Sequence, residues 1–599
     1  MKTATIAALL AMPLFSADDA LMRAMRDELS RSMRKLQLEN LDKPYFVAYR
    51  IVETTGCSAT ASFGALTGGG CQTPETASRS RTLNVEVRVG DYARDNTNFF
   101  APMMTSGVIR IVSNSAGNGV AVPVDDNYDE LRRQLWLATD SAYKTALDSY
   151  AKKKAALEHR RREEDTPPDF SKEPVVAVNE ADPPLTWNPR DVQALVKSLS
   201  AVFRDQPAID NSDVRFTATR WTTWYANSEG TTYTRAKNLV QLQCNADTQA
   251  IDGMPLVDFD VAYARTVAGL PSRDDMTKRI RTLAARMTAA RKAPLVDRYS
   301  GPVLFESQAA AELFFQSMGS ALTGSPRTVT DAGVAGAVFT NLNANAGFAD
   351  RVGARVLPDF LSIKDAPASL EFKGQPLFGG YEVDDEGVKA GETPLVDRGV
   401  LQTLLHSRSL IPNTTHSSAN RRAAGVMPSN LLFTAEKPLT SEQIKAELIR
   451  IVKQRNKEYG ILVRRMNNQM LSISLGRARV VTFSMSSGPA ALQVEPAIEA
   501  YKVFADGHEE LVRNLNIAGL TLDSFKSVVA VSEPSTVYTA PTRPGARLSL
   551  GGLATLAQGS PNLVSANVPA MLFEDMTLQK PSGDVPVLPF STHPYFEKQ

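Results

Sequence analysis

The stretch GPVLFESQAAAELFFQSMGSALTG occupies residues 301–324 and opens the second half of the chain. Its apolar, β-branched start predicts a short strand over 303–305. The run that follows is rich in Ala, Leu and Phe and predicts a helix over 309–322. The second half of the chain is therefore expected to begin with a strand followed by a helix.

The pattern C-terminal to this pair becomes mainly β from about residue 358. One clear helix interrupts it over 441–456, where Ser441, Glu442 and Gln443 supply a cap and acidic charge. Turns alternate with strand-like runs at 370–372, 471–475, 480–483, 498–504 and 528–531. Residues 297–599 are therefore expected to form a mainly antiparallel β domain with a central helix.

The pattern N-terminal to the pair mixes helices with strands. Glu229-Gly230 is a turn dipeptide that joins two strands as a hairpin. Helices are predicted over 20–38, 125–164 and 190–203, and strands over 44–52, 81–89, 214–221, 224–226, 231–235, 239–245 and 257–267. Residues 18–272 are therefore expected to form an α+β domain, which gives the whole chain an α+β fold class.

Two segments are expected to connect parts of the fold. Residues 165–189 contain Pro167-Pro168 and Pro183-Pro184 and lack periodicity, which is typical of an exposed, Pro-rich linker. Residues 273–296 form a clean helical pattern with Ser272 as a possible cap. We interpret that second segment as a connecting helix between the two domains.

The composition limits what the protein can do. The 599 residues include 66 Lys and Arg against 65 Asp and Glu, so a net charge of +1 supplies no basic field for nucleic acid. Only 5 His and 3 Cys occur, which excludes a zinc-finger array and a disulfide-dense scaffold. Any metal or nucleophile site must be built from very few side chains.

The N-terminus is typical of an export signal. Lys2 is followed by an apolar run over residues 4–15, then by Ser16 and Ala17. Such a run is too short to span a bilayer but fits the hydrophobic region of a signal peptide, so residues 1–17 are predicted to be one. The alternative is an ordinary N-terminal helix. No later run of 18 apolar residues occurs, so a periplasmic or secreted protein without a membrane span is expected.

Export would place the cysteines in an oxidising compartment. Cys57 and Cys71 flank the Gly-rich segment GALTGGG and either form a disulfide or remain thiols. Cys244 lies in a strand-like run and is expected to be a buried apolar residue rather than a nucleophile.

The order of segments resembles the TldD/PmbA family, the modulators of DNA gyrase, over nearly the whole chain. The resemblance rests on residues 301–324, on VDDEGV at 383–388 and on LVDRGVLQTLLHSR at 395–408. VPAMLFEDMTLQK at 568–580 adds to it, and so do PYFVAYRI and RTLNVEVRVGDY in the N-terminal half. The branch that it favours is the PmbA-like one, which lacks the zinc motif.

The resemblance implies a metallopeptidase scaffold. Active members carry His-Glu-x-x-x-His on the helix of the 301–324 stretch, where two His bind zinc and the Glu activates water. In this chain those positions hold Phe315, Gln316 and Ser320, with Gly319 before the last of them. The family's third ligand is a Cys near the C-terminus, but no Cys follows Cys244. We therefore predict no catalytic residue, no metal and no zinc cofactor here.

A relocated site is the alternative that would keep peptidase activity. His406 in a predicted strand and His416 in a polar turn could converge with the carboxylates of Asp384, Asp385 and Glu386. The preferred hypothesis is instead a subunit that binds unfolded or extended peptide. The resemblance implies a homo-oligomer, or a hetero-oligomer with a zinc-bearing TldD-type paralogue. A third hypothesis is a purely structural envelope protein.

Overall fold

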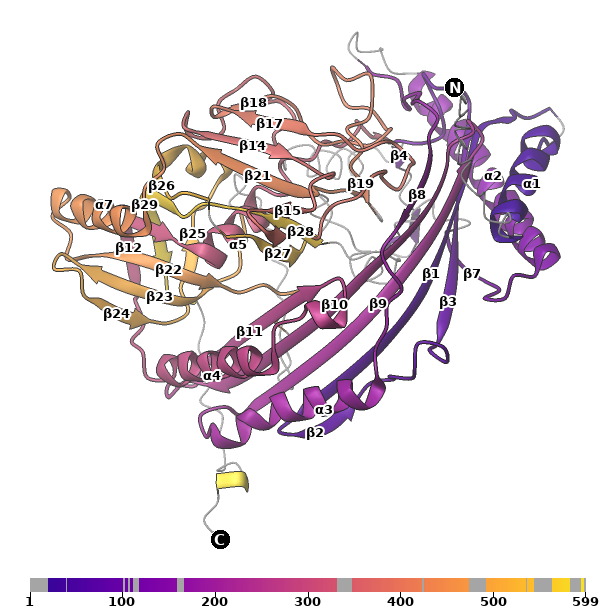
Figure 1. The fold of residues 1–599 in the computed structure, drawn as a ribbon. Coiled ribbons are helices and arrows are strands. Elements are labelled where there is room, and N and C mark those ends of the chain that lie inside the picture. The colour runs from indigo at the N-terminus through magenta and orange to yellow at the C-terminus, as the bar shows by residue number, and fades with distance from the viewer. Residues whose placement is uncertain are drawn as a thin grey trace, which may run out of the picture.

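The computed structural model describes residues 20–38, 40–100, 103–105, 108–110, 118–158, 166–330, 347–422, 425–472, 492–534, 536–542, 563–581 and 594–596. Its layout is α+β, as expected, with one long curved sheet beside two smaller ones (Figure 1). The predicted signal peptide at 1–17 lies outside the described residues. No helix in the described part of the chain is both long and apolar enough to span a bilayer.

The first sheet has eight strands, six of them in the order β11-β10-β9-β1-β3-β7. The sequence pattern predicts four shorter strands where the structure has the two long, continuous strands β9 and β10. Gly230, with a φ of 103°, turns the chain between them. The bounds are β1 Pro44–Ser62, β2 Ala65–Gly68, β3 Arg79–Val89, β7 Asn118–Val122, β8 Ala177–Ala181, β9 Asn211–Asn227, β10 Thr232–Gln249 and β11 Pro255–Ala264.

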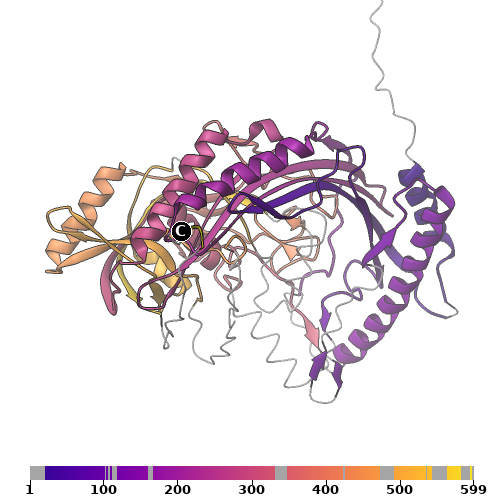
Figure 2. The ribbon, with the colours of Figure 1, turned by 90° about the horizontal axis from the view of Figure 1, so that it is seen from below.

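Four helices cover the convex face of this sheet: α1 Ala20–Lys35, α2 Tyr128–Glu158, α3 Pro189–Ser200 and α4 Arg273–Ala290 (Figure 2). Successive side chains of β10 point to opposite faces of the sheet. Val240, Leu242 and Cys244 join the apolar core under α3 and α4. Gln243, on the opposite face, donates a hydrogen bond from Nε2 to the carbonyl of Leu471 at 2.5 Å. The polar face of the sheet therefore meets the C-terminal half.

The segment 165–189 is not the exposed linker that its prolines suggested. β8 within it pairs in parallel with β10, and the side chains of Phe170, Leu185 and Trp187 are buried. Proline prevents a helix here but permits an edge strand, which is the position that β8 takes. The helix α4 also differs from expectation, because its apolar residues are buried against the sheet and it is part of the N-terminal layer.

The C-terminal half contains two further large sheets. One has the order β24-β23-β22-β12-β29-β25, with β26 beside β29, and the other β18-β17-β14-β21-β28-β27. Their bounds are β12 Arg298–Phe305, β14 Leu361–Asp365, β17 Thr393–Asp397, β18 Val400–Leu401, β21 Asn430–Ala435, β22 Tyr459–Met466, β23 Ala497–Phe504, β24 Glu509–Val512, β25 Asn516–Ala518, β26 Val528–Val531, β27 Tyr538–Pro541, β28 Leu563–Ala566 and β29 Met571–Gln579.

Most strand pairs in this half are antiparallel, as predicted, although β12–β22 and β21–β28 are parallel. The helix α7 Ser441–Gln454 begins with a capping box between Thr440 and Gln443. The expected strand at 480–483 lies outside the described residues. The described residues also form short elements: β4 Phe99–Phe100, β5 Met103–Thr105, β6 Val108–Arg110, β13 Val329–Thr330, β15 Glu371–Phe372, β16 Gln375–Pro376, β19 Arg421–Arg422, β20 Gly425–Val426 and the 3-10 turns Ala201–Asp205, Val267–Gly269, Leu522–Ser527 and Pro594–Phe596.

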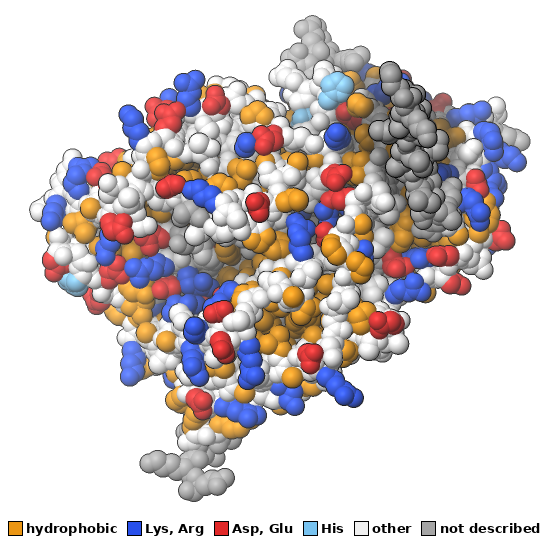
Figure 3. Space-filling model, viewed as in Figure 1, with side chains coloured by type: hydrophobic (Ala, Val, Ile, Leu, Met, Phe, Trp, Pro, Cys, Tyr) orange, Lys and Arg blue, Asp and Glu red, His pale blue; other side chains and the backbone are white. Residues whose placement is uncertain are grey.

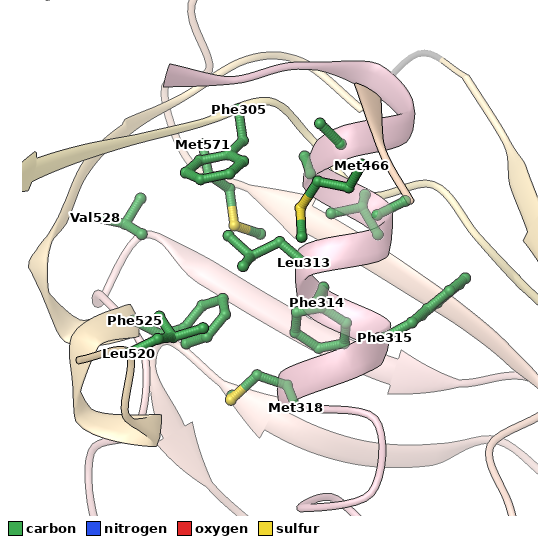
Figure 4. Packing of buried hydrophobic residues seen from close by; sticks show 14 of the residues in the cluster. Phe305, Leu313, Phe314, Phe315, Met318, Met466, Leu520, Phe525, Val528 and Met571 are labelled. Atoms are coloured by element: carbon green, nitrogen blue, oxygen red, sulfur yellow. The ribbon is translucent and has the colours of Figure 1, made fainter. Parts of the chain in front are cut away.

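The helix α5 Ser307–Ser317 lies at the centre of the largest apolar core. Phe314 packs edge-on against Phe433 and Phe525, at ring-centroid distances of 4.8 and 6.3 Å. Phe315 points to the other side of the helix (Figure 4). Apolar partners therefore surround this helix and hold its backbone in place.

The structure joins Cys57 and Cys71 in a disulfide, with their Cα atoms 4.4 Å apart. The bond ties β1 to the chain that follows β2, across a sequence separation of 14. Closing a loop of this size should stabilise the fold by about 3 kcal/mol. We expect the double variant Cys57→Ser/Cys71→Ser to lose about that free energy of unfolding in urea titrations. Cys244→Ser, a change at the buried free cysteine, tests whether any loss is specific to the disulfide.

Candidate functional site

Phe315, which the family resemblance assigns to the first zinc-ligand position, lies in an aromatic stack. The ring of Phe315 lies 6.1 Å from that of Tyr538 on β27, with an angle of 28° between their planes. Only 7% of Phe315 is exposed, and the residue belongs to the apolar core. A phenyl ring offers no lone pair to a cation, so this position cannot bind a metal.

Gln316, which the resemblance assigns to the position of the catalytic glutamate, makes hydrogen bonds through both polar atoms of its amide. Its Nε2 donates to Glu312 Oε2 and to the carbonyl of Asn467, both at 2.8 Å. Its Oε1 accepts from the backbone N–H of Glu495 at 2.7 Å. A carboxamide cannot take a proton from water at neutral pH, and this one serves to join three chain segments.

The last two positions of the motif follow the end of α5. Gly319 lies in the turn after the helix, and a Cβ there would approach the carbonyl oxygen of Phe315 to 2.7 Å. Ser320 is half-buried, and its carbonyl accepts hydrogen bonds from Thr323. A neutral serine hydroxyl is a poor zinc ligand compared with imidazole or thiolate.

These residues do not fit a zinc ion. Phe315 is stacked, both polar atoms of the Gln316 amide have protein partners, and no imidazole lies at either ligand position. Across the described ranges of the chain, no three His, Cys, Asp or Glu side chains group closely enough to hold a metal. The structure thus supports no step that runs through a metal at this site.

A buried carboxylate one helical turn earlier is a feature that the sequence analysis missed. Glu312 is inaccessible to solvent and accepts hydrogen bonds from Tyr538 at 2.5 Å and from Asn468 and Gln316 at 2.8 Å. Burial raises the pKa of its carboxyl above the usual value, and these three donors act against that rise. The sequence does carry a signal for this buried carboxylate, which is the single Glu within the apolar run AAAELFF.

The alternative site, in which His406 and His416 would converge with the carboxylates of residues 384–386, is not formed in the structure. Both ring nitrogens of His406 face backbone carbonyls, Nδ1 that of Leu404 at 2.9 Å and Nε2 that of His416 at 2.8 Å. The side chain of His416 is 69% exposed and lies 3.5 Å from Glu173. His406 also falls outside the strands, contrary to expectation. Both imidazoles thus have partners other than the three carboxylates.

One of those carboxylates, Asp385, joins the two halves of the molecule, whereas Asp384 and Glu386 bond to backbone groups of the C-terminal half. Asp385 pairs with Arg50 and Arg235 of the first sheet at 2.5 Å each. Glu386 accepts the backbone N–H of Arg408 at 2.8 Å. Asp384 accepts from three backbone N–H groups, and burial, followed by the charge of Glu386, raises its pKa to about 8. The three carboxylates are thus engaged in structural contacts.

Sequence comparison relates part of this chain to a family of metallopeptidases. Residues 298–580 match the family profile described as PmbA/TldA metallopeptidase C-terminal domain. A metalloprotease of Archaeoglobus fulgidus is 35% identical over 109 residues, and one of Methanocaldococcus jannaschii 34% over 86. These stretches cover 17% and 14% of this chain and only 26% and 18% of those proteins.

Solved structures extend the likeness in fold to most of the chain. A putative modulator of a DNA gyrase from Thermotoga maritima gives a TM-score of 0.55 at 14% identity, and TldE from Thermococcus kodakarensis 0.56 at 12%. Each comparison covers 93% of this chain and 99% of the other. Residues 298–580 therefore match the C-terminal domain of the PmbA/TldD metallopeptidase family, and the chain as a whole shares its fold with solved proteins such as TldE.

Proposed function

We propose that this protein is a zinc-free member of the family that binds unfolded or extended peptide and does not itself cleave it. The observation that carries the proposal is the replacement of the zinc-binding positions by a packed assembly. Phe315 stacks on Tyr538, and Gln316 bonds to Glu312, Asn467 and Glu495. A zinc-bearing TldD-type paralogue in a hetero-oligomer would then supply the catalysis.

A sheet edge beside this assembly supports peptide binding. The strand β27 ends the six-stranded sheet, and among the described residues only β28 pairs with it. An extended peptide can add to such an edge through backbone hydrogen bonds, which place few demands on its sequence. Tyr538, which starts β27, is the residue that stacks on Phe315.

We further propose that the protein is exported to the periplasm or secreted. The residues 1–17 have the pattern of a signal peptide. The disulfide between Cys57 and Cys71 supports the same conclusion, because such bonds persist in oxidising compartments.

Peptide binding is tested by fluorescence anisotropy of a labelled, unstructured peptide of about ten residues. The proposal expects saturable binding, and chromatography should recover the peptide intact. The variant Thr539→Pro removes one backbone N–H from β27 and should weaken binding if that edge is used. Efficient cleavage by the purified chain alone would refute the non-catalytic role, and absence of binding would refute peptide recognition.

A further inference from the structure

A small pocket at the junction of the two halves is rich in cationic side chains. It has about 40 Å³ of water-sized space and contains Arg235, Lys237, Arg265 and Arg422, with Asp384 and Asp385 as its carboxylates. A single water needs roughly 10–15 Å³ on this measure, so the space suits a head group of about three heavy atoms. Positive and negative side chains are otherwise intermixed on the face seen in Figure 3.

The two carboxylates of the pocket are directed at protein partners. Both oxygens of Asp384 accept backbone N–H groups, from Glu386 and Val388 on one oxygen and from Arg421 on the other. The two oxygens of Asp385 are held by Arg50 and Arg235. A bound anion would therefore meet the cations of the pocket without displacing either carboxylate.

Lys237 and Arg265 are the cations placed to receive a ligand. Both are half-buried, and Lys237 pairs with Glu180, which uses one of the three N–H donors of its ammonium group. Arg265 donates from Nη2 to the carbonyl of Leu377 at 3.0 Å, but its carboxylate partner Asp182 is 3.7 Å away, which is too far for a hydrogen bond. Donor capacity therefore remains on both side chains.

Arg235 and Arg422 form the inner wall of the pocket. Both are largely buried, and each donates to backbone carbonyls: Arg235 to that of Val383 at 2.8 Å, and Arg422 to those of Pro428 and Leu563 at 2.6 and 3.0 Å. Their charge is fixed in place by the fold. Substituting them would disturb folding, so Lys237 and Arg265 are the residues to test.

The pocket lies next to the sheet edge to which peptide binding was assigned. Phe378, which lines the pocket, donates its backbone N–H to Ser565 Oγ at 2.8 Å. Ser565 Oγ in turn lies 2.7 Å from Thr539 Oγ1 on β27. Ser565 thus links the pocket-lining residue Phe378 to Thr539 of the strand along which the peptide would pair.

We propose that this pocket binds the C-terminal α-carboxylate of the extended peptide. The inference rests on the proposed peptide-binding function and adds to it a preference for a free C-terminus. A carboxylate has the size that the space admits, and charge-assisted hydrogen bonds from Lys237 and Arg265 would fix the end of the peptide. The adjacent Phe378 ring supplies an apolar surface for the last side chain.

The test compares one labelled peptide in two forms, with a free C-terminus and with a C-terminal amide, on the full-length protein. We expect the free acid to bind at least about tenfold more tightly, which is the ratio that one charge-assisted hydrogen bond supports. The double variant Lys237→Gln/Arg265→Gln should reduce that ratio to below about twofold, while binding of the amide stays unchanged. Arg450→Gln, an exposed change on α7, is the matched control.

The other outcomes separate the two proposals. Equal affinity for the acid and amide forms would overturn the carboxylate pocket and leave peptide binding intact. If neither form binds, the peptide-binding function fails. The pocket can then be tested with inorganic phosphate, which should raise the Tm of the wild-type protein but not that of the double variant if the pocket binds another anion. That result would overturn the peptide C-terminus as the ligand of the pocket. A ratio that persists in the double variant would overturn the assignment to these residues.

Discussion

Phe315→Ala is expected to lower the free energy of unfolding by about 3–5 kcal/mol. The ring is 7% exposed, belongs to the central core and stacks on Tyr538, so its removal leaves a cavity and an unstacked partner. Urea unfolding followed by tryptophan fluorescence measures the change.

Phe315→Leu is the matched control, because it retains most of the apolar volume and should cost less than about 1.5 kcal/mol. A negligible effect of the alanine substitution would contradict the core role of Phe315. It would show that the residue lines an open cavity, and the former zinc position would then be accessible to ligands.

Asp385→Ala is expected to cost about 3–5 kcal/mol, because it removes the one carboxylate that both Arg50 and Arg235 contact at 2.5 Å. These guanidinium groups belong to the first sheet, whereas Asp385 lies in the C-terminal half. The variant would leave Arg235, whose side chain is only 9% exposed, without its carboxylate partner at the junction.

Glu392→Ala gives the comparison for this variant. Glu392 pairs with Lys364, and both side chains are about half exposed, so its loss should change stability by less than about 1 kcal/mol. If Asp385→Ala had an equally small effect in the same unfolding assay, Asp385 would not be what ties the halves together.

Much of the fold could be predicted from periodicity. The α+β class, the start of α4 at its Ser272 cap and the strand at 528–531 match the structure closely, because each has a regular pattern with a clear start signal. The segment 165–189 could not be predicted, since two proline pairs hide a short edge strand whose pairing with β10 is non-local.

At the candidate site, the sequence indicates which side chains stand at the expected zinc-binding positions but not what those side chains contact. Side-chain chemistry alone shows that Phe315 and Gln316 cannot perform zinc chemistry. The partners that now occupy the position, Glu312 and Tyr538, are 226 residues apart in sequence and meet only in the folded chain. The strand predicted around His406 was wrong, and one of the two carbonyls that engage its ring belongs to His416, ten residues away.

The measurement that tests the central claim most directly is elemental analysis of the full-length protein, purified without chelators and dialysed against zinc-free buffer. We expect well below about 0.1 equivalents of zinc per chain, because no residue at the ligand positions offers an imidazole, thiolate or carboxylate. One tightly bound equivalent that survives dialysis would contradict the account and place a metal site somewhere in this chain.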